Sequence, residues 1–110
     1  MDAVNEFLKK NYHTRTVRGP KGLVEVPMTT KRLICRDGFG ISVQANEFRY
    51  CVPQENRAWP YSYVELCYPR WIDPLIFAYA DDPGTIETFY PYVPIELVNK
   101  LVEKHGGINE

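Results

Sequence analysis

Apolar residues recur along the chain with the spacings of helices and of strands. Near the N-terminus, four apolar residues between positions 3 and 8 lie on one helical face behind Asp2, a residue preferred at helix N-caps. This pattern predicts a short helix from Asp2 to about Tyr12. Residues 13–22 interrupt it, and Gly19-Pro20 favours a turn or an extended linker before a short strand at 23–26.

The central region has the two-residue alternation of strands. Asp37-Gly38 is a preferred pair for a tight hairpin turn, and it separates two such segments. Segment 39–45 places its apolar residues on one face. In 61–68, Val64 and Leu66 face opposite to Tyr61 and Tyr63. The predicted strands of this region are 31–36, 39–45, 48–52 and 61–68.

The sequence pattern after Pro69 does not distinguish a strand from a helical turn. Residues 75–80 are apolar on both faces, which suits either a buried strand or a helical turn. Pro83 and Gly84 occupy the central positions of a type II turn, and residues 85–90 alternate again, so a second hairpin is expected here. Residues 94–105 form an amphipathic helix that Gly106-Gly107 ends in the left-handed conformation.

These elements predict an α+β fold. We expect a mostly antiparallel sheet of about four to six strands, with the C-terminal helix packed on it and an additional short N-terminal helix. Strands joined by short turns argue against a doubly wound nucleotide-binding fold. We divide the chain into a helix and basic arm at 1–27 and a single core domain at 28–110.

The charge is unevenly distributed along the 110 residues, although the net charge is −1. Residues 1–49 carry nine Lys or Arg and five Asp or Glu, a net of +4, whereas residues 50–110 carry four and nine, a net of −5. The N-terminal region contains a basic run with no acidic residue within it, made up of Lys9, Lys10, Arg15, Arg18 and Lys21. Such a run is either a solvated face or a site that attracts phosphate or an acidic protein surface.

The net charge of −1 argues against a dedicated nucleic-acid binder and against a protein that imitates DNA by charge alone, so direct nucleic-acid binding is not expected. No apolar run has the length of a membrane span, and the charged N-terminus lacks the apolar stretch of a signal peptide. We therefore expect a cytoplasmic protein with no membrane contact.

Catalytic and metal-binding patterns are weak. Cys35, Cys51 and Cys67 are evenly spaced, but a structural zinc site needs four ligands, usually in close pairs, and none is present. Nothing beside a cysteine resembles a nucleophile elbow, and His105 is explained by its place at a helix end. We expect reduced, buried thiols, no catalytic residues, no metal and no cofactor, and hence a protein that is not an enzyme.

The aromatic residues are the remaining signal, at 14% of the chain. Seven of the eight tyrosines and both tryptophans follow residue 49, some in or beside loops. Tyr, Trp and Arg are enriched at binding hot spots, whereas ordinary packing under loops is the alternative. The predicted partner-binding residues are Arg57, Trp59, Tyr61, Tyr63, Arg70 and Trp71.

The chain resembles a group of small proteins from phage and prophage genomes. The resemblance lies in segments 31–39 and 42–45, in Tyr50-Cys51-x-Pro53, in Tyr92-Val93-Pro94 and in 103–108, the sequence EKHGGI. These motifs are turns and helix ends, so they carry no chemistry. The resemblance implies an accessory protein acting in a bacterial cytoplasm, of the kind that binds and blocks host defence machinery such as a CRISPR–Cas effector.

Three functional hypotheses follow. The first is a non-enzymatic protein that binds and inhibits a host protein or nucleoprotein complex. The second is a protein that sequesters a small molecule or nucleotide signal, in a pocket that a homodimer interface would complete. The third is a weak nucleic-acid binder that uses residues 9–21.

Overall fold

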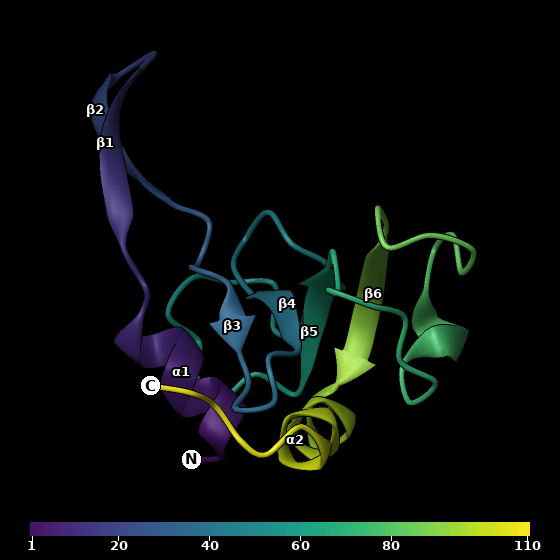
Figure 1. The fold of residues 1–110 in the computed structure, drawn as a ribbon. Coiled ribbons are helices and arrows are strands. Elements are labelled where there is room, and N and C mark those ends of the chain that lie inside the picture. The colour runs from purple at the N-terminus through teal and green to yellow at the C-terminus, as the bar shows by residue number, and fades with distance from the viewer.

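The computed structural model describes residues 1–110 and confirms the α+β prediction (Figure 1). Two helices, a short 3₁₀ helix and six strands are present, and the strands form two separate sheets. None of the helices is long and apolar enough to cross a membrane. In chain order the elements are α1 (Ala3–Lys10), β1 (Thr14–Gly19), β2 (Gly22–Pro27), β3 (Leu33–Ile34), β4 (Gly40–Gln44), β5 (Tyr63–Cys67), η1 (Phe77–Tyr79), β6 (Phe89–Pro94) and α2 (Ile95–Lys104).

The main sheet is an antiparallel meander in the order β3-β4-β5-β6. The predicted Asp37-Gly38 turn joins β3 to β4, with Gly38 in the left-handed region at φ 94° and the Asp37 carboxylate accepting from the Phe39 amide. The predicted strand 31–36 is shorter than expected, because only Leu33 and Ile34 pair with β4.

The predicted strand at 48–52 was wrong. Side chains accept two of its amides, since Asn46 accepts from Phe48 and Glu65 from Tyr50, and the amides of Arg49 and Cys51 donate to carbonyls within residues 46–49. An isolated bridge between Val52 and Tyr63 and a hydrogen bond from the Tyr92 amide to the Tyr50 carbonyl attach it to the sheet backbone.

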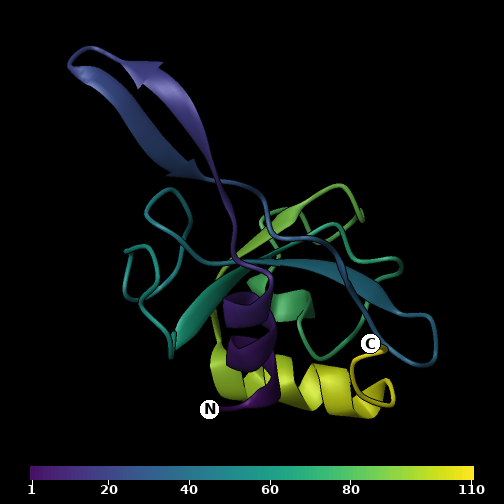
Figure 2. The same ribbon diagram turned by 90° about the vertical axis from the view of Figure 1, so that its left-hand side faces the viewer.

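The hydrophobic core lies between the main sheet and the two helices, which are on the same side of it (Figure 2). The alternation in β4 is confirmed, since Phe39, Ile41 and Val43 are fully buried in this core. Val64 and Leu66 of β5 are buried there too. The opposite, outer face of β5 is also covered, because Glu65 and Cys67 are almost completely buried.

Both predicted helices are present and pack against each other. Asp2 caps α1 by accepting from the amide of Asn5, and the Asn99 side chain of α2 accepts from the amide of Val4. Val4, Phe7 and Leu8 belong to the common core, so α1 is part of the core domain and not of an N-terminal appendage as the division at residue 27 implied. Beyond α2, Gly106 and Gly107 adopt the expected left-handed conformation, at φ 89° and 87°.

The second predicted hairpin is not formed. The apolar segment 75–80 is a helical turn, η1, and Gly84 does not have the positive φ of a type II turn. The following residues run as a loop until β6 begins at Phe89. The loop is closed by the amide of Asp81, which donates to the Phe89 carbonyl, and by the amide of Asp82, which donates to Thr88 Oγ1.

Residues 14–27, which we call the arm, form a two-stranded antiparallel ribbon that projects from the body (Figures 1 and 2). The predicted strand at 23–26 is confirmed within β2. The preceding stretch, expected to be a linker, is β1, and Pro20-Lys21 forms the turn between the pair Gly19 and Gly22. β1 and β2 pair only with each other.

Candidate functional site

The arm exposes apolar and basic side chains together. Directly opposed residues of an antiparallel pair lie on the same face, and Arg18 is opposed to Leu23 and Thr16 to Glu25. The other face carries Arg15, Val17, Val24 and Val26. Leu23 is 72% exposed, one of the most exposed large apolar residues of the chain. With no core beneath them, these side chains are available for contacts with another molecule.

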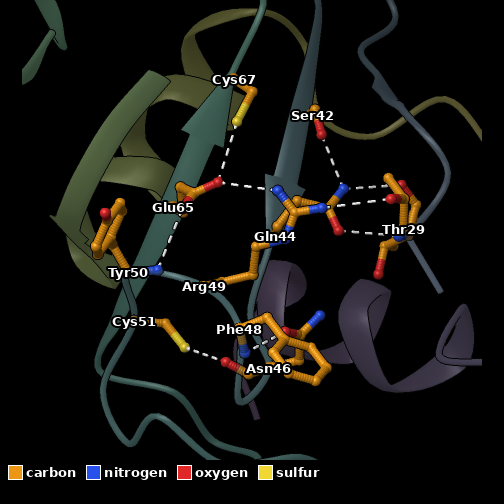
Figure 3. A network of polar contacts seen from close by, with 11 residues as sticks. Thr29, Ser42, Gln44, Asn46, Phe48, Arg49, Tyr50, Cys51, Glu65 and Cys67 are labelled. Atoms are coloured by element: carbon orange, nitrogen blue, oxygen red, sulfur yellow. Dashed lines mark hydrogen bonds and ion pairs between the residues drawn. The ribbon is translucent and has the colours of Figure 1, made fainter. Parts of the chain in front are cut away.

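The arm is tethered to the outer face of the main sheet through residues 28–30. Gln44 of β4 clamps the backbone of Thr30 by accepting from its amide and donating to its carbonyl, both at 2.9 Å. Gln44 is itself positioned by a 2.8 Å hydrogen bond from Nε2 to Ser42 Oγ (Figure 3). Since both Gln44 and Thr30 are buried, this contact sets where the arm leaves the body.

A second contact on this face involves the buried carboxylate of Glu65. Arg49 Nη1 donates to it at 3.0 Å, and the amide of Tyr50 and the thiol of Cys67 donate as well (Figure 3). Arg49 also reaches Thr29 Oγ1 at 3.3 Å. Every polar group here has a partner, so the network attaches segments to the sheet rather than offering a reactive group.

The base of the arm carries an aromatic and cationic cluster. The guanidinium of Arg57 lies 5.2 Å from the ring centroid of Tyr12, and Tyr12 contacts Trp59 edge-on at 5.5 Å. Arg57 also lies 4.0 Å from Glu25 of β2. The structure thus brings the predicted contacts Arg57 and Trp59 to the arm, and adds Tyr12, which the sequence analysis did not single out.

Tyr61 does not belong to this surface, which corrects its prediction as a partner contact. It is 1% exposed because its ring enters the core, and its hydroxyl donates to the Glu55 carbonyl and accepts from the Ala58 amide. The buried side chain of Asn5 holds the backbone of Tyr61, because it donates to the Tyr61 carbonyl and accepts from the Tyr61 amide. Tyr61 therefore shapes the loop that presents Arg57.

The other predicted contacts lie elsewhere. Tyr63 is exposed on the outer face beside Val52, away from the core. Arg70 donates to the Gly38 carbonyl at the β3–β4 turn, and Trp71 packs edge-on against Phe39. The six predicted residues therefore do not form one surface. Arg57 and Trp59 lie at the base of the arm, Tyr63 on the outer face of the sheet, Arg70 and Trp71 at the β3–β4 turn, and Tyr61 in the core.

The basic run is also divided. Lys9 and Lys10 belong to the last turn of α1, where Lys10 pairs with Glu110 at 3.4 Å. Arg15, Arg18 and Lys21 are exposed on the arm. The arm keeps the part of the basic run that lies next to exposed apolar side chains.

The buried His105 is the centre of an ionic cluster that the sequence did not reveal. Its Nδ1 lies 2.6 Å from Asp37 Oδ2 and its Nε2 lies 2.7 Å from Asp73 Oδ2, while Lys104 Nζ lies 3.0 Å from both oxygens of Asp73. Phe39 stacks on the imidazole at 4.2 Å. Both ring nitrogens are thus engaged by carboxylates, so His105 joins the end of α2 to Asp37 and Asp73.

The carboxylates of this cluster are stabilised in their ionised form. Hydrogen bonds from the Phe39 amide and from His105 lower the pKa of Asp37. Burial alone raises the pKa of Asp73, but hydrogen bonds from the Leu75 amide, His105 and Lys104 outweigh it and leave the pKa below its ordinary value. The prediction that Asp37 is a turn residue is confirmed. Its contact with His105 joins residues 68 positions apart, and no local sequence pattern indicates it.

The three cysteines are buried and unpaired, as predicted. Burial, with a smaller contribution from Asp37, raises the pKa of the Cys35 thiol to about 11. Burial and the hydrogen bond to Glu65 raise that of Cys67 to about 12. Burial likewise raises the pKa of Cys51. Such thiols are poor nucleophiles at neutral pH.

A groove of about 780 Å³ lies between α1, α2 and the C-terminal residues. Phe7 and Val102 form part of its apolar lining, and Glu6, Arg36 and Glu103 are among its charged residues. Phe7 is its single aromatic residue, and none of the predicted partner contacts lines it. The groove therefore lacks the convergent aromatics and arginines expected of a site that sequesters a nucleotide.

The arm and the cluster at its base are the best candidate for a functional site, because exposed apolar and cationic side chains of the projecting ribbon lie next to Arg57 and the half-buried rings of Tyr12 and Trp59. Comparisons of the chain with protein-family models, with curated proteins and with solved structures find no match.

Proposed function

We propose that the protein is a non-enzymatic binding protein that docks on an acidic, partly apolar surface of another protein through its arm. The contact is made by one face of the arm and the cluster at its base, which together we call the arm surface. It consists of Thr16, Arg18, Leu23, Glu25, Tyr12, Arg57 and Trp59.

The observation that supports this proposal is the placement of Arg57. It lies over the Tyr12 ring and within 4.0 Å of Glu25, on the arm face that also carries Leu23 and Arg18. The arm surface is thus continuous from the tip of the ribbon to Trp59. Aromatic and arginine anchors surrounded by polar side chains are the composition of protein-binding hot spots.

The resemblance to phage accessory proteins makes a bacterial host protein or nucleoprotein complex the partner to test first, with inhibition as the consequence of its binding. The arm carries three basic side chains and one carboxylate, which favours an acidic partner surface over a basic one.

The test is affinity capture from bacterial lysate on the immobilised protein, with Arg18→Glu and Arg57→Ala compared with wild type. Both residues are exposed, so we expect the variants to fold. The matched control is Lys100→Glu, an exposed charge reversal on α2. We expect both arm variants to lose a captured protein that Lys100→Glu retains.

Retention of every captured protein by both arm variants contradicts the proposal. Capture of nucleic acid instead, with binding that falls steeply as salt rises, supports the weak nucleic-acid binder. Loss of the same protein with Trp71→Ala but not with the arm variants moves the site to the β3–β4 turn.

A further inference from the structure

The outer edge of β2 has no partner within the chain. β1 and β2 form a sheet of two strands, so each has one edge without backbone pairing, and Figure 1 shows both edges away from the main sheet. A two-stranded ribbon alone is marginally stable in water, and an unprotected edge is a template for another strand. The arm is thus an incomplete sheet.

The pairing within the arm determines which groups point outward from β2. The amide of Met28 donates to the His13 carbonyl at 2.9 Å, so the hydrogen-bonded pairs of this register involve the even-numbered residues of β2. The N–H and C=O groups of Leu23 and Glu25 therefore point away from β1. An added antiparallel strand must pair with these two residues.

The segment from Lys21 to Glu25 is complementary to itself. When two copies run antiparallel with Leu23 opposite Leu23, Lys21 of each copy, the turn residue that precedes β2, lies beside Glu25 of the other, within reach of its long side chain. In this register the outward-pointing N–H and C=O groups of Leu23 in one copy face those of Leu23 in the other and can hydrogen-bond to them. The two adjacent registers lack this match, because one pairs Glu25 with Leu23 and the other pairs Leu23 with Lys21 and Glu25 with Gly19. The next register puts Glu25 opposite Glu25.

The free edge of β1 offers no comparable match. Its side chains include Arg15 and Arg18 and no carboxylate, so a second copy pairing there brings four arginines together. Charged residues on an edge strand protect it against pairing. β2 has one carboxylate and exposes Leu23 and Val24, which are 72% and 46% accessible.

We propose that the occupant of the β2 edge is a second copy of this chain, paired antiparallel in the register centred on Leu23. The product is a four-stranded sheet, β1-β2-β2-β1, with two symmetric ion pairs between Lys21 and Glu25. Because directly opposed residues share a face, the two arm surfaces lie on the same side of this sheet. The inference goes beyond the proposed function, since a partner can dock on the arm surface of a monomer as well as of a dimer.

The first test is a charge-reversal cycle followed by sedimentation velocity from low micromolar to millimolar protein. Wild type forms a dimer. Lys21→Glu and Glu25→Lys each replace both ion pairs with like charges and raise the dimer Kd about tenfold. The double variant Lys21→Glu with Glu25→Lys restores the pairs in reverse and returns the Kd close to the wild-type value.

The second test is cross-linking in the same register. Leu23→Cys places two thiols at a hydrogen-bonded pair, where the Cα atoms of antiparallel strands are about 5.5 Å apart and within disulfide range. We expect rapid disulfide dimer formation on mild oxidation. Arg18→Cys, directly opposite on the β1 edge, is the control and remains monomeric.

A protein that stays monomeric at millimolar concentration overturns the inference. So does a dimer whose Kd is unchanged by either single charge reversal, or equal cross-linking by Leu23→Cys and Arg18→Cys. Pairing of the β2 edge with a strand of another protein would appear as a monomer in isolation and also overturns it. None of these outcomes bears on capture of a partner by the arm surface.

Discussion

His105 Nε2 lies 2.7 Å from Oδ2 of Asp73, and both side chains are almost fully buried. The other ring nitrogen lies 2.6 Å from Asp37. The imidazole therefore joins the end of α2 to the β3–β4 turn and to the loop after β5, and the ionisation of Asp37 and Asp73 is linked to the stability of the fold.

Stability is expected to fall in acid through Asp37 and Asp73. Because their folded pKa values are lower than the unfolded ones, their contribution is present above about pH 4 and is lost as pH falls through the folded values. We expect the urea unfolding free energy to drop between about pH 5 and pH 2.5. Asp73→Asn should cost about 2–4 kcal/mol at pH 5 and show a smaller drop.

Asp81→Asn is the control for this acid effect, since Asp81 is exposed and its carboxylate makes no hydrogen bond. It should follow the wild-type curve. If Asp73→Asn loses as much stability in acid as wild type does, Asp73 does not contribute to the linkage.

Tyr61→Phe tests whether this hydroxyl supports the loop of Arg57. The variant removes the hydrogen bonds to the Glu55 carbonyl and from the Ala58 amide, and we expect a loss of about 1–2 kcal/mol in unfolding free energy. Tyr68→Phe is the matched change at an exposed tyrosine and should have no effect. Equal melting temperatures of the two variants would show that the hydroxyl of Tyr61 is not structural.

Arg49 and Glu65 should behave as a coupled pair. Arg49→Met leaves the buried Glu65 carboxylate with only a backbone amide and a thiol as donors, and Glu65→Gln leaves Arg49 without its counter-ion. We expect each single change to cost about 1–3 kcal/mol. The double variant should cost less than their sum, as measured by chemical denaturation. Strict additivity would mean that the pair is not coupled.

Gly106→Ala should destabilise the protein by about 1–2 kcal/mol, because Gly106 has a left-handed φ of 89° that a Cβ disfavours. The added Cβ would also lie 3.3 Å from Arg36 Cβ. Gly84→Ala is the control, since Gly84 has no such φ and only the Asp82 carboxylate nearby at 3.6 Å. Thermal denaturation should separate the two variants, and equal effects would contradict the conformational argument.

Much of the fold could be predicted from local patterns. The N-cap at Asp2, the turn at Asp37-Gly38 and the left-handed end at Gly106 each depend on neighbours within a few positions, and each is present. The predicted hairpin at Pro83-Gly84 was wrong although its contacts are local, whereas the wrong strand at 48–52 involves distant partners. Residues 48–52 alternate like a strand, yet the amides of Phe48 and Tyr50 donate to side chains, the latter to that of Glu65, and only an isolated bridge forms at Val52.

The candidate site was only partly predictable. The concentration of Arg and aromatic residues pointed to Arg57 and Trp59, but Tyr61, two positions further on, is buried. Tyr12 has no distinguishing local pattern, and it joins the cluster because α1 ends beside the loop of Arg57. Residue type selects the candidates for binding, whereas exposure depends on how distant segments cover one another.

The amino-acid sequence by itself determined the two α-helices, the Asp37-Gly38 turn and the apolar face of β4, because side-chain periodicity and backbone preference act over a few residues. The tertiary structure alone decided that the basic arm is a free ribbon, that Tyr61 is core, and that His105 lies between Asp37 and Asp73. These features depend on contacts between positions far apart in the chain, whose free energy arises only when the core closes.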